Sequence, residues 1–130
     1  MEIYLKVLKE NYVNFNGRAR RKEFWIFQLF LIIITGICTV LDNVLGTVVV
    51  IDGSPFGRIV LPYGWLYFLC SIFHFLPSLS VLVRRLHDVG KSGWWFLIGY
   101  VPFIGIIWLL YLVCKDGDHG ENSYGNNPKV

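Results

Sequence analysis

The stretch FWIFQLFLIIITGICTVL, residues 24–41, contains no charged side chain. Two more uncharged stretches follow it, at residues 59–83 and 92–114. An α-helix rises about 1.5 Å per residue and the hydrocarbon core of a bilayer is about 30 Å thick, so each stretch is long enough to span it. Strands of a membrane barrel would instead alternate apolar and polar residues over about ten positions. The sequence therefore predicts an all-α membrane protein, with transmembrane helices over residues 24–44, 61–83 and 92–114.

The length and composition indicate one membrane domain over residues 1–130. The chain is 55% hydrophobic and 17% aromatic, and 130 residues leave no room for a second domain. Residues 115–130 are rich in Gly, Asn and Asp, so we expect an extended polar tail. The three cysteines lack metal-ligand spacing, and we expect neither a metal site nor a cofactor.

Basic residues are concentrated before the first stretch and between the second and third. Nine of the twelve lie there, namely Lys6, Lys9, Arg18, Arg20, Arg21, Lys22, Arg84, Arg85 and Lys91. Only Arg58, Lys115 and Lys129 lie elsewhere. Cytoplasmic loops carry the excess of Lys and Arg in membrane proteins, so this asymmetry places the N-terminus in the cytoplasm. With three spans, the C-terminus is then expected outside.

Residues 2–12 are predicted to form a short amphipathic helix ahead of the first span. Tyr4 and Val7 fall on one helical face, while Lys6 and Lys9 fall elsewhere. Such a helix suits the headgroup boundary of the membrane, where anionic lipid attracts lysine. The alternative is an ordinary surface helix that docks on the rest of the protein.

Polar residues and prolines mark special positions within the spans. Asp42 is expected at the far membrane interface, followed by a turn at residues 52–55. Pro62 suits the first position of the second helix, and Pro77 is expected to kink it. His74 would lie near the bilayer midplane, which makes it a candidate intramembrane polar site. The alternative is a neutral imidazole that bonds to a neighbouring helix.

The densest polar cluster is RRLHDVGKSGWW, residues 84–95. If the second helix continues through Asp88, Arg84 faces Asp88 at i+4 and His87 at i+3. The cluster could bind phosphate or lipid headgroups through arginine donors, or use His87 and Asp88 as a base and its orienting group. The third interpretation is structural, with arginines fixing topology and tryptophans anchoring the membrane interface.

Motifs along nearly the whole chain occur in a recognisable order. They are FNGRARRKEFW at 15–25, LP at 76–77, RRLHD at 84–88, SGWW at 92–95, PFIG at 102–105 and GENSYG at 120–125. In these motifs the chain resembles domain-of-unknown-function family 805, a group of small bacterial inner-membrane proteins. Asn16 and Ser123 depart from the family pattern without disturbing the rest. The resemblance implies an inner-membrane location and a helical bundle, but no activity, because the family has no established one.

The leading hypothesis is a non-enzymatic membrane component that binds anionic lipid or a partner protein at its basic cytoplasmic face. Glu23 is expected to position the arginines by ion pairing. The candidate binding residues are Arg18, Arg20, Arg21, Arg84, Arg85, His87, Asp88 and Lys91. The alternative is an oligomeric transporter or channel lined by His74 and the kink at Pro77. A headgroup-modifying enzyme comes third; we assign no catalytic residue and expect no nucleic-acid partner.

Overall fold

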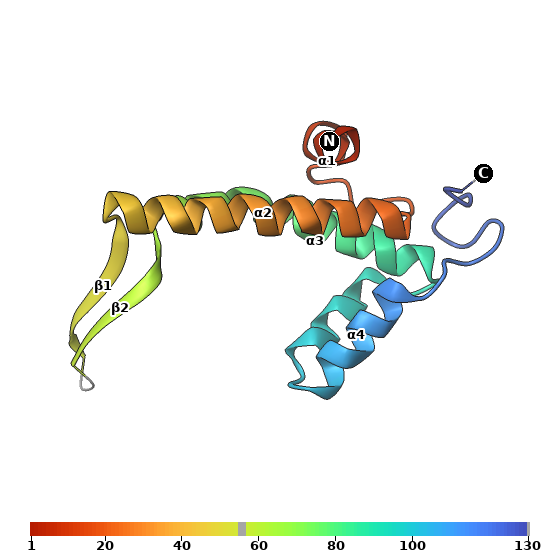
Figure 1. Ribbon diagram of the computed structural model, residues 1–130. Helices are drawn as coiled ribbons and strands as arrows, with labels where there is room; N and C mark the ends of the chain where they lie inside the picture. Colours follow the sequence, from red (N-terminus) through yellow and green to blue (C-terminus); the bar gives the residue numbers. More distant parts are fainter. Residues whose placement is uncertain (55–56, 130) are drawn as a thin grey trace. The chain divides into compact units, whose positions relative to one another are not determined.

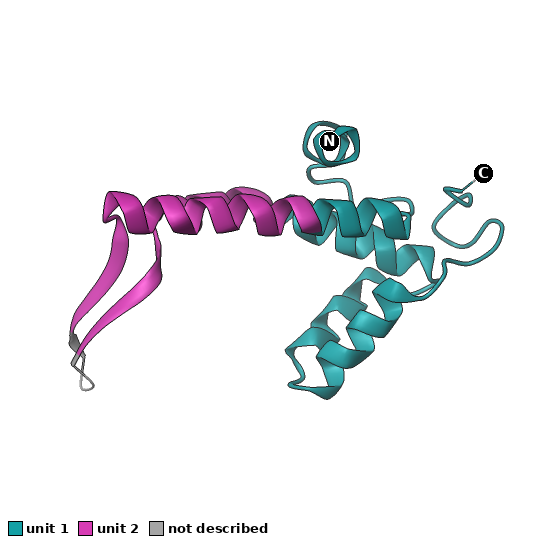
Figure 2. Cartoon of the chain, viewed as in Figure 1, with its two compact units in different colours: residues 1–28, 76–130 teal, residues 29–75 magenta. Residues whose placement is uncertain are grey.

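The computed structural model describes residues 1–54 and 57–129. Its elements are α1 (Glu2–Glu10), α2 (Arg21–Leu45), β1 (Val48–Ser54), β2 (Gly57–Gly64), α3 (Trp65–Asp88), the 3₁₀ helix η1 (Gly93–Tyr100) and α4 (Ile104–Cys114) (Figure 1). The chain contains two compact units, each of which includes part of α2 and part of α3 (Figure 2). The single membrane domain stays a prediction. Unit 1 comprises Met1–Gln28 and Leu76–Val130, and unit 2 comprises Leu29–Phe75.

Within the described residues, α2 and α3 are the two helices long and apolar enough to cross a membrane. Helix α2 covers the first predicted span. Helix α3 starts later and ends later than the predicted 61–83. The chain before Trp65 belongs to β2, and the RRLHD segment at residues 84–88, here called the basic corner, continues the helix to Asp88. Pro62 therefore lies in a strand and does not begin the helix, and α3 continues through Pro77.

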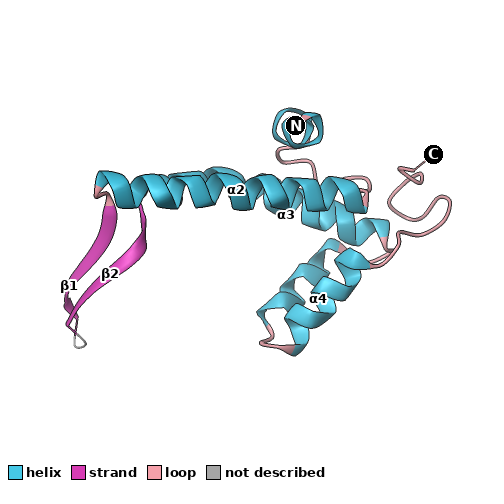
Figure 3. Ribbon diagram, in the orientation of Figure 1, coloured by secondary structure: helices cyan, strands magenta, loops and turns pink. Residues whose placement is uncertain are grey.

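Unit 2 contains an antiparallel hairpin of β1 and β2, so the all-α prediction is wrong here (Figure 3). Val50 pairs with Val60, and Ile51 pairs with Ile59. β-Branched side chains favour extended backbone, and the apolar run after α2 is composed of them. The predicted turn at residues 52–55 falls partly on β1, and Pro55 lies outside the described residues.

Asp42 joins the elements of unit 2 through its carboxylate, which is fully buried. It accepts hydrogen bonds from the Thr47 hydroxyl at 2.5 Å, the Gly64 amide at 3.1 Å, the Leu66 amide at 3.1 Å and the Tyr67 amide at 2.9 Å. The first amides of a helix lack partners within the helix, so this carboxylate satisfies donors at the start of α3. Sequence reasoning gave Asp42 only a place at the membrane interface.

The third uncharged stretch is not one helix, and the prediction of a continuous helix over 92–114 is wrong. Helix η1 ends at Tyr100, and α4 begins at Ile104 after a turn that contains Pro102. Proline lacks the amide that a continuing helix needs. Helix α4 contacts η1, so the chain turns back on itself (Figure 1). Gly105 permits this contact, because a Cβ there would overlap the Ile98 carbonyl.

Unit 1 has two separate apolar contacts, one between α1 and α2 and one at the end of α3. Tyr4 and Val7 of α1 are buried, and the Tyr4 ring stacks on Phe27 of α2 at 5.6 Å between centroids. The predicted amphipathic helix is therefore present and docks on the protein through its apolar face. Its position at the membrane interface stays a prediction. The apolar core beside the basic corner consists of Leu86, Val89 and Leu112, packed against Phe96 and Leu109.

Candidate functional site

Asp88 is the centre of a buried ionic cluster in unit 1. Its Oδ1 accepts from Arg18 Nε at 3.0 Å, and its Oδ2 pairs with Arg85 Nη1. The three side chains expose at most 2% of their surface. Charges at such depth are stable only when they are paired and hydrogen-bonded, because burial removes their hydration. Asp88 thus neutralises two arginines that come from distant parts of the chain.

The remaining donors of the two arginines bind main-chain carbonyls of the C-terminal segment. Arg18 donates to the carbonyls of Asp118 at 2.6 Å and Gly120 at 2.7 Å. Arg85 donates to Val113 O at 3.0 Å and also to Lys115 O. A guanidinium offers five N–H donors, and here most of them are used inside the protein. The two arginines therefore fasten the tail to α3.

The tail is consequently not extended but packs against the end of α3 and against Arg18. The turn between η1 and α4 brings the chain back toward this contact. The number of membrane crossings stays a prediction. The Asp118 amide donates to the Asp88 carbonyl at 2.7 Å. Gly117 lies so close to α3 that a Cβ would overlap the Asp88 carboxylate. Both ends of unit 1 meet at the basic corner.

Arg84 does not face Asp88 as the i+4 spacing predicted. Its Nη1 pairs with Glu23 Oε1 of α2 at 2.7 Å, because Asp88 is already occupied by two other arginines. The Arg84 side chain is 5% exposed. Among the described residues, its Nε and Nη2 have no hydrogen-bond partner.

His87 and Asp88 bond to different partners and do not form a base with its orienting group. The His87 Nδ1 lies 3.2 Å from the Gly17 carbonyl, which can only accept, so Nδ1 carries the proton. The imidazole stacks on Tyr124 of the tail, with centroids 3.9 Å apart and planes at 4°. Asn122 also donates to the His87 carbonyl at 2.9 Å. His87 thus helps to hold the tail in place.

The other predicted binding residues are more accessible. Arg20 and Lys22 are exposed, and neither forms an ion pair within the described part of the chain. Arg21 pairs with Asp116 at 2.5 Å, and its side chain is 44% exposed. The Lys91 Nζ lies 5.3 Å from the centroid of the Trp95 ring. The predicted set therefore divides into buried, internally bonded arginines and outward-facing cations.

His74 is buried in unit 2, within α3. Its Nδ1 lies 2.8 Å from the Cys70 carbonyl one turn earlier, so the imidazole donates to its own helix. This bond lies within α3, whereas the structural alternative expected a bond to a neighbouring helix. A conduction path at His74 stays a prediction.

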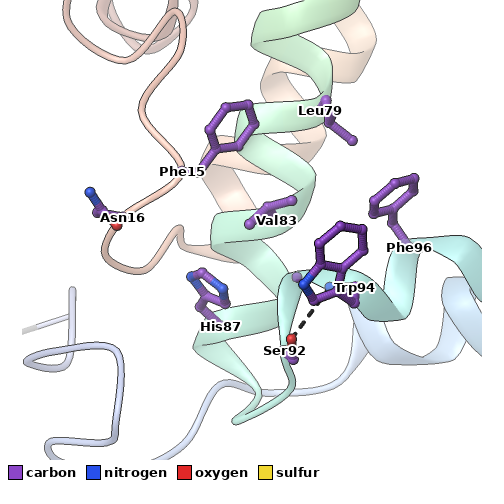
Figure 4. A pocket seen from close by; sticks show the side chains of 9 residues that line it. Phe15, Asn16, Leu79, Val83, His87, Ser92, Trp94 and Phe96 are labelled. Atoms are coloured by element: carbon purple, nitrogen blue, oxygen red, sulfur yellow. Dashed lines mark hydrogen bonds between the residues drawn. The ribbon is translucent and has the colours of Figure 1, made fainter.

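A pocket opens in unit 1 between the residue 15–16 segment, α3 and η1 (Figure 4). Its volume is about 460 Å³, within the range of pockets that bind small molecules. It is lined by Phe15, Asn16, Leu79, Val83, His87, Ser92, Gly93, Trp94 and Phe96. The sequence pointed to His87 but gave no signal for the pocket, because its walls come from three separated segments. Elsewhere in the described residues, no group of three or more His, Cys, Asp or Glu side chains could hold a metal ion.

Comparison with known proteins gives a family and relatives of matching length. The family model described as "Protein of unknown function (DUF805)" matches residues 12–126. The chain is 46% identical over 130 residues to inner membrane protein YhaI of Escherichia coli K12, covering 99% of this chain and 97% of that protein. It is also 46% identical over 132 residues to inner membrane protein YhaH of the same strain, covering 100% of this chain and 98% of that protein. No solved structure matches the chain.

Proposed function

The chain belongs to the DUF805 family, and on this basis we propose that it is a non-enzymatic inner-membrane component whose basic cytoplasmic face binds anionic lipid headgroups. The proposal is supported by the difference between its buried, paired cations and its exposed, unpaired ones. Arg18 and Arg85 use their N–H donors to bind Asp88 and the C-terminal segment. Arg20 and Lys22, in contrast, are exposed and form no ion pair in the described chain. The exposed cations are therefore the ones available to a ligand.

The proposed topology has two crossings, by α2 and α3, with both ends on one side. Arg18 bonds to the Gly120 carbonyl, and groups in direct contact cannot lie on opposite faces of a membrane. The hairpin of η1 and α4 then enters and leaves on the same side. Eleven of the twelve Lys and Arg residues fall on that side, and Arg58 in β2 is the exception. By the positive-inside rule, this side is the cytoplasm.

The topology is tested by labelling with a membrane-impermeant maleimide in a background in which all three cysteines are replaced by serine. Ser123→Cys places an exposed thiol on the tail, and Arg58→Cys places one in the hairpin. We expect Arg58→Cys to react in intact spheroplasts and Ser123→Cys to react only after permeabilisation. Equal labelling of both variants in intact spheroplasts would restore the three-span topology.

Lipid binding is tested with the double variant Arg20→Gln/Lys22→Gln. Native mass spectrometry of protein equilibrated with equal phosphatidylglycerol and phosphatidylethanolamine measures which lipid is retained. Each surface cation contributes about 1 kcal/mol toward binding anionic lipid, so removing two should lower the preference for phosphatidylglycerol about thirtyfold. Arg58→Gln is the matched control, because it removes an exposed cation from the opposite side. An unchanged preference in the double variant would reject the proposal and leave a partner protein as the ligand of this face.

A further inference from the structure

The pocket of unit 1 is amphipathic along its length (Figure 4). Leu79, Val83 and Phe96 form its apolar wall, and His87 and Ser92 lie at its polar end. Leu79 precedes His87 by eight residues on α3, which corresponds to about 12 Å along the helix. The pocket thus runs from the basic corner toward the apolar part of α3. In a membrane, that direction leads from the headgroups into hydrocarbon.

The polar end retains hydrogen-bonding capacity. The Ser92 hydroxyl accepts from the Trp94 amide at 3.4 Å, and its own hydrogen has no acceptor among the described residues. The His87 Nδ1 is used by the Gly17 carbonyl, which leaves Nε2 as the ring nitrogen without a described partner. Both groups line the pocket. One donor and one acceptor are therefore present where a headgroup would lie.

A cation and two indole rings lie next in the chain to the residues at the polar end of the pocket. Lys91 directly precedes the lining residue Ser92 in the chain, and its ammonium lies over the ring of Trp95, which follows the lining residue Trp94; Lys91 and Trp95 do not themselves line the pocket. Trp94, which lines the pocket, is 74% exposed. Indole rings beside lysine are typical of the headgroup level of membranes. In the described chain Lys91 forms no ion pair, so its charge is available to an anionic group.

We propose that this pocket binds one anionic phospholipid, with an acyl chain along Leu79, Val83 and Phe96 and the phosphodiester at Ser92 and Lys91. The apolar wall excludes a purely polar ligand, and the charge at the polar end selects an anionic headgroup. The proposal rests on the proposed function for its membrane orientation and goes beyond it, because it assigns one lipid to a separate, defined site. It differs in location, since the exposed Arg20 and Lys22 do not line the pocket.

The test fills the apolar end of the pocket. In Leu79→Trp the larger side chain occupies the space of the acyl chain, whereas Leu97→Trp changes an exposed residue of η1 that does not line the pocket. After partial delipidation, native mass spectrometry should show one retained phospholipid in the wild type and in Leu97→Trp. In Leu79→Trp, the occupancy should fall at least tenfold. Equal occupancy in a folded Leu79→Trp protein would overturn the proposal.

A second pair of variants keeps the test decisive if Leu79→Trp fails to fold. Trp94→Ala removes an exposed indole and should lower retention of the lipid, while Lys91→Gln should retain lipid but lose about fivefold of its preference for phosphatidylglycerol over phosphatidylethanolamine. Wild-type retention and preference in both variants would reject the site.

The failure of the pocket and the failure of the basic face are distinguishable. If Arg20→Gln/Lys22→Gln changes lipid preference and the pocket variants do not, the proposed function stands and the pocket proposal falls. If only the pocket variants change retention, the lipid site stands and the exposed basic face has no part in it.

Discussion

Arg18 and Asp88 are 70 positions apart in the chain and form an ion pair at 3.0 Å in which both side chains are almost fully buried. Arg85 completes the pair from the other side of the carboxylate. This contact joins the segment before α2 to the end of α3, and it directs Arg18 toward the tail. Arg18 and Arg85, two of the predicted binding residues, therefore make contacts within the protein.

Asp88→Asn should destabilise unit 1 strongly. The substitution keeps the shape of the side chain but leaves two buried guanidinium groups without a counter-charge, which costs roughly 3–5 kcal/mol. Thermal unfolding in detergent should show a clearly lower Tm than the wild type. Asp52→Asn is the control, because its partner Arg58 is 71% exposed and such surface pairs contribute at most about 1 kcal/mol. Equal melting temperatures for the two variants would contradict the buried cluster.

Gly117→Ala should release the tail from α3. The added methyl would overlap the Asp88 carboxylate, so the segment must move away. Limited proteolysis should then cleave the tail, after residue 115, faster than in the wild type. Gly36→Ala provides the comparison, since a Cβ there meets nothing and alanine favours a helix. Wild-type protection of the Gly117→Ala tail would show that the tail does not depend on this close approach.

Asp42→Asn should loosen the start of α3 in unit 2. An amide oxygen accepts fewer hydrogen bonds than a carboxylate, so several of the four donors lose their partner, at about 1–3 kcal/mol for a buried group. Hydrogen exchange should accelerate at the amides of Gly64, Leu66 and Tyr67. In Thr35→Val, which removes a hydroxyl bonded only within α2, these amides should exchange at the wild-type rate.

Attachment of the tail should weaken at acid pH. The pKa of Asp116 lies below its ordinary value of 3.8, because Lys129 donates to its carboxylate and Arg21 adds positive charge. A carboxyl with a lowered folded-state pKa stabilises the fold above the unfolded pKa, and this contribution is lost as the pH falls through the folded value. Protease protection of the tail should therefore decrease below about pH 3.8. At neutral pH, Asp116→Asn should be less protected than the wild type, and the difference should vanish in acid.

Sequence reasoning predicted the features that follow from composition over long windows. The apolar runs at α2 and α3, the short helix α1 and the family were all readable from the residues. Pro102 is present in the sequence, but the apolar residues on both sides of it led to the prediction of one continuous helix, where the structure has η1 and α4. Hydropathy measures how favourably a stretch transfers into lipid, but it does not show where the chain changes direction within that stretch.

The site was less predictable, because its partners are set by tertiary contacts. The spacing of Arg84 and Asp88 satisfied the i+4 rule, yet Asp88 pairs with Arg18 and Arg85. Local spacing cannot reveal a competitor 70 positions away. The carbonyl partners of Arg18 had no sequence signal at all, since every residue carries a carbonyl. The pocket could not be predicted either, because its lining residues come from segments that meet only in the folded chain.

The fastening of Arg18 also sets an order of assembly. The Gly120 carbonyl that it binds lies 102 positions later, so the ribosome makes it long after Arg18 has emerged. A chain that stops early, or loses its last segment to a protease, leaves buried donors without acceptors. Residues 118–120 are therefore needed for the stability of a contact made by a residue near the start of the chain.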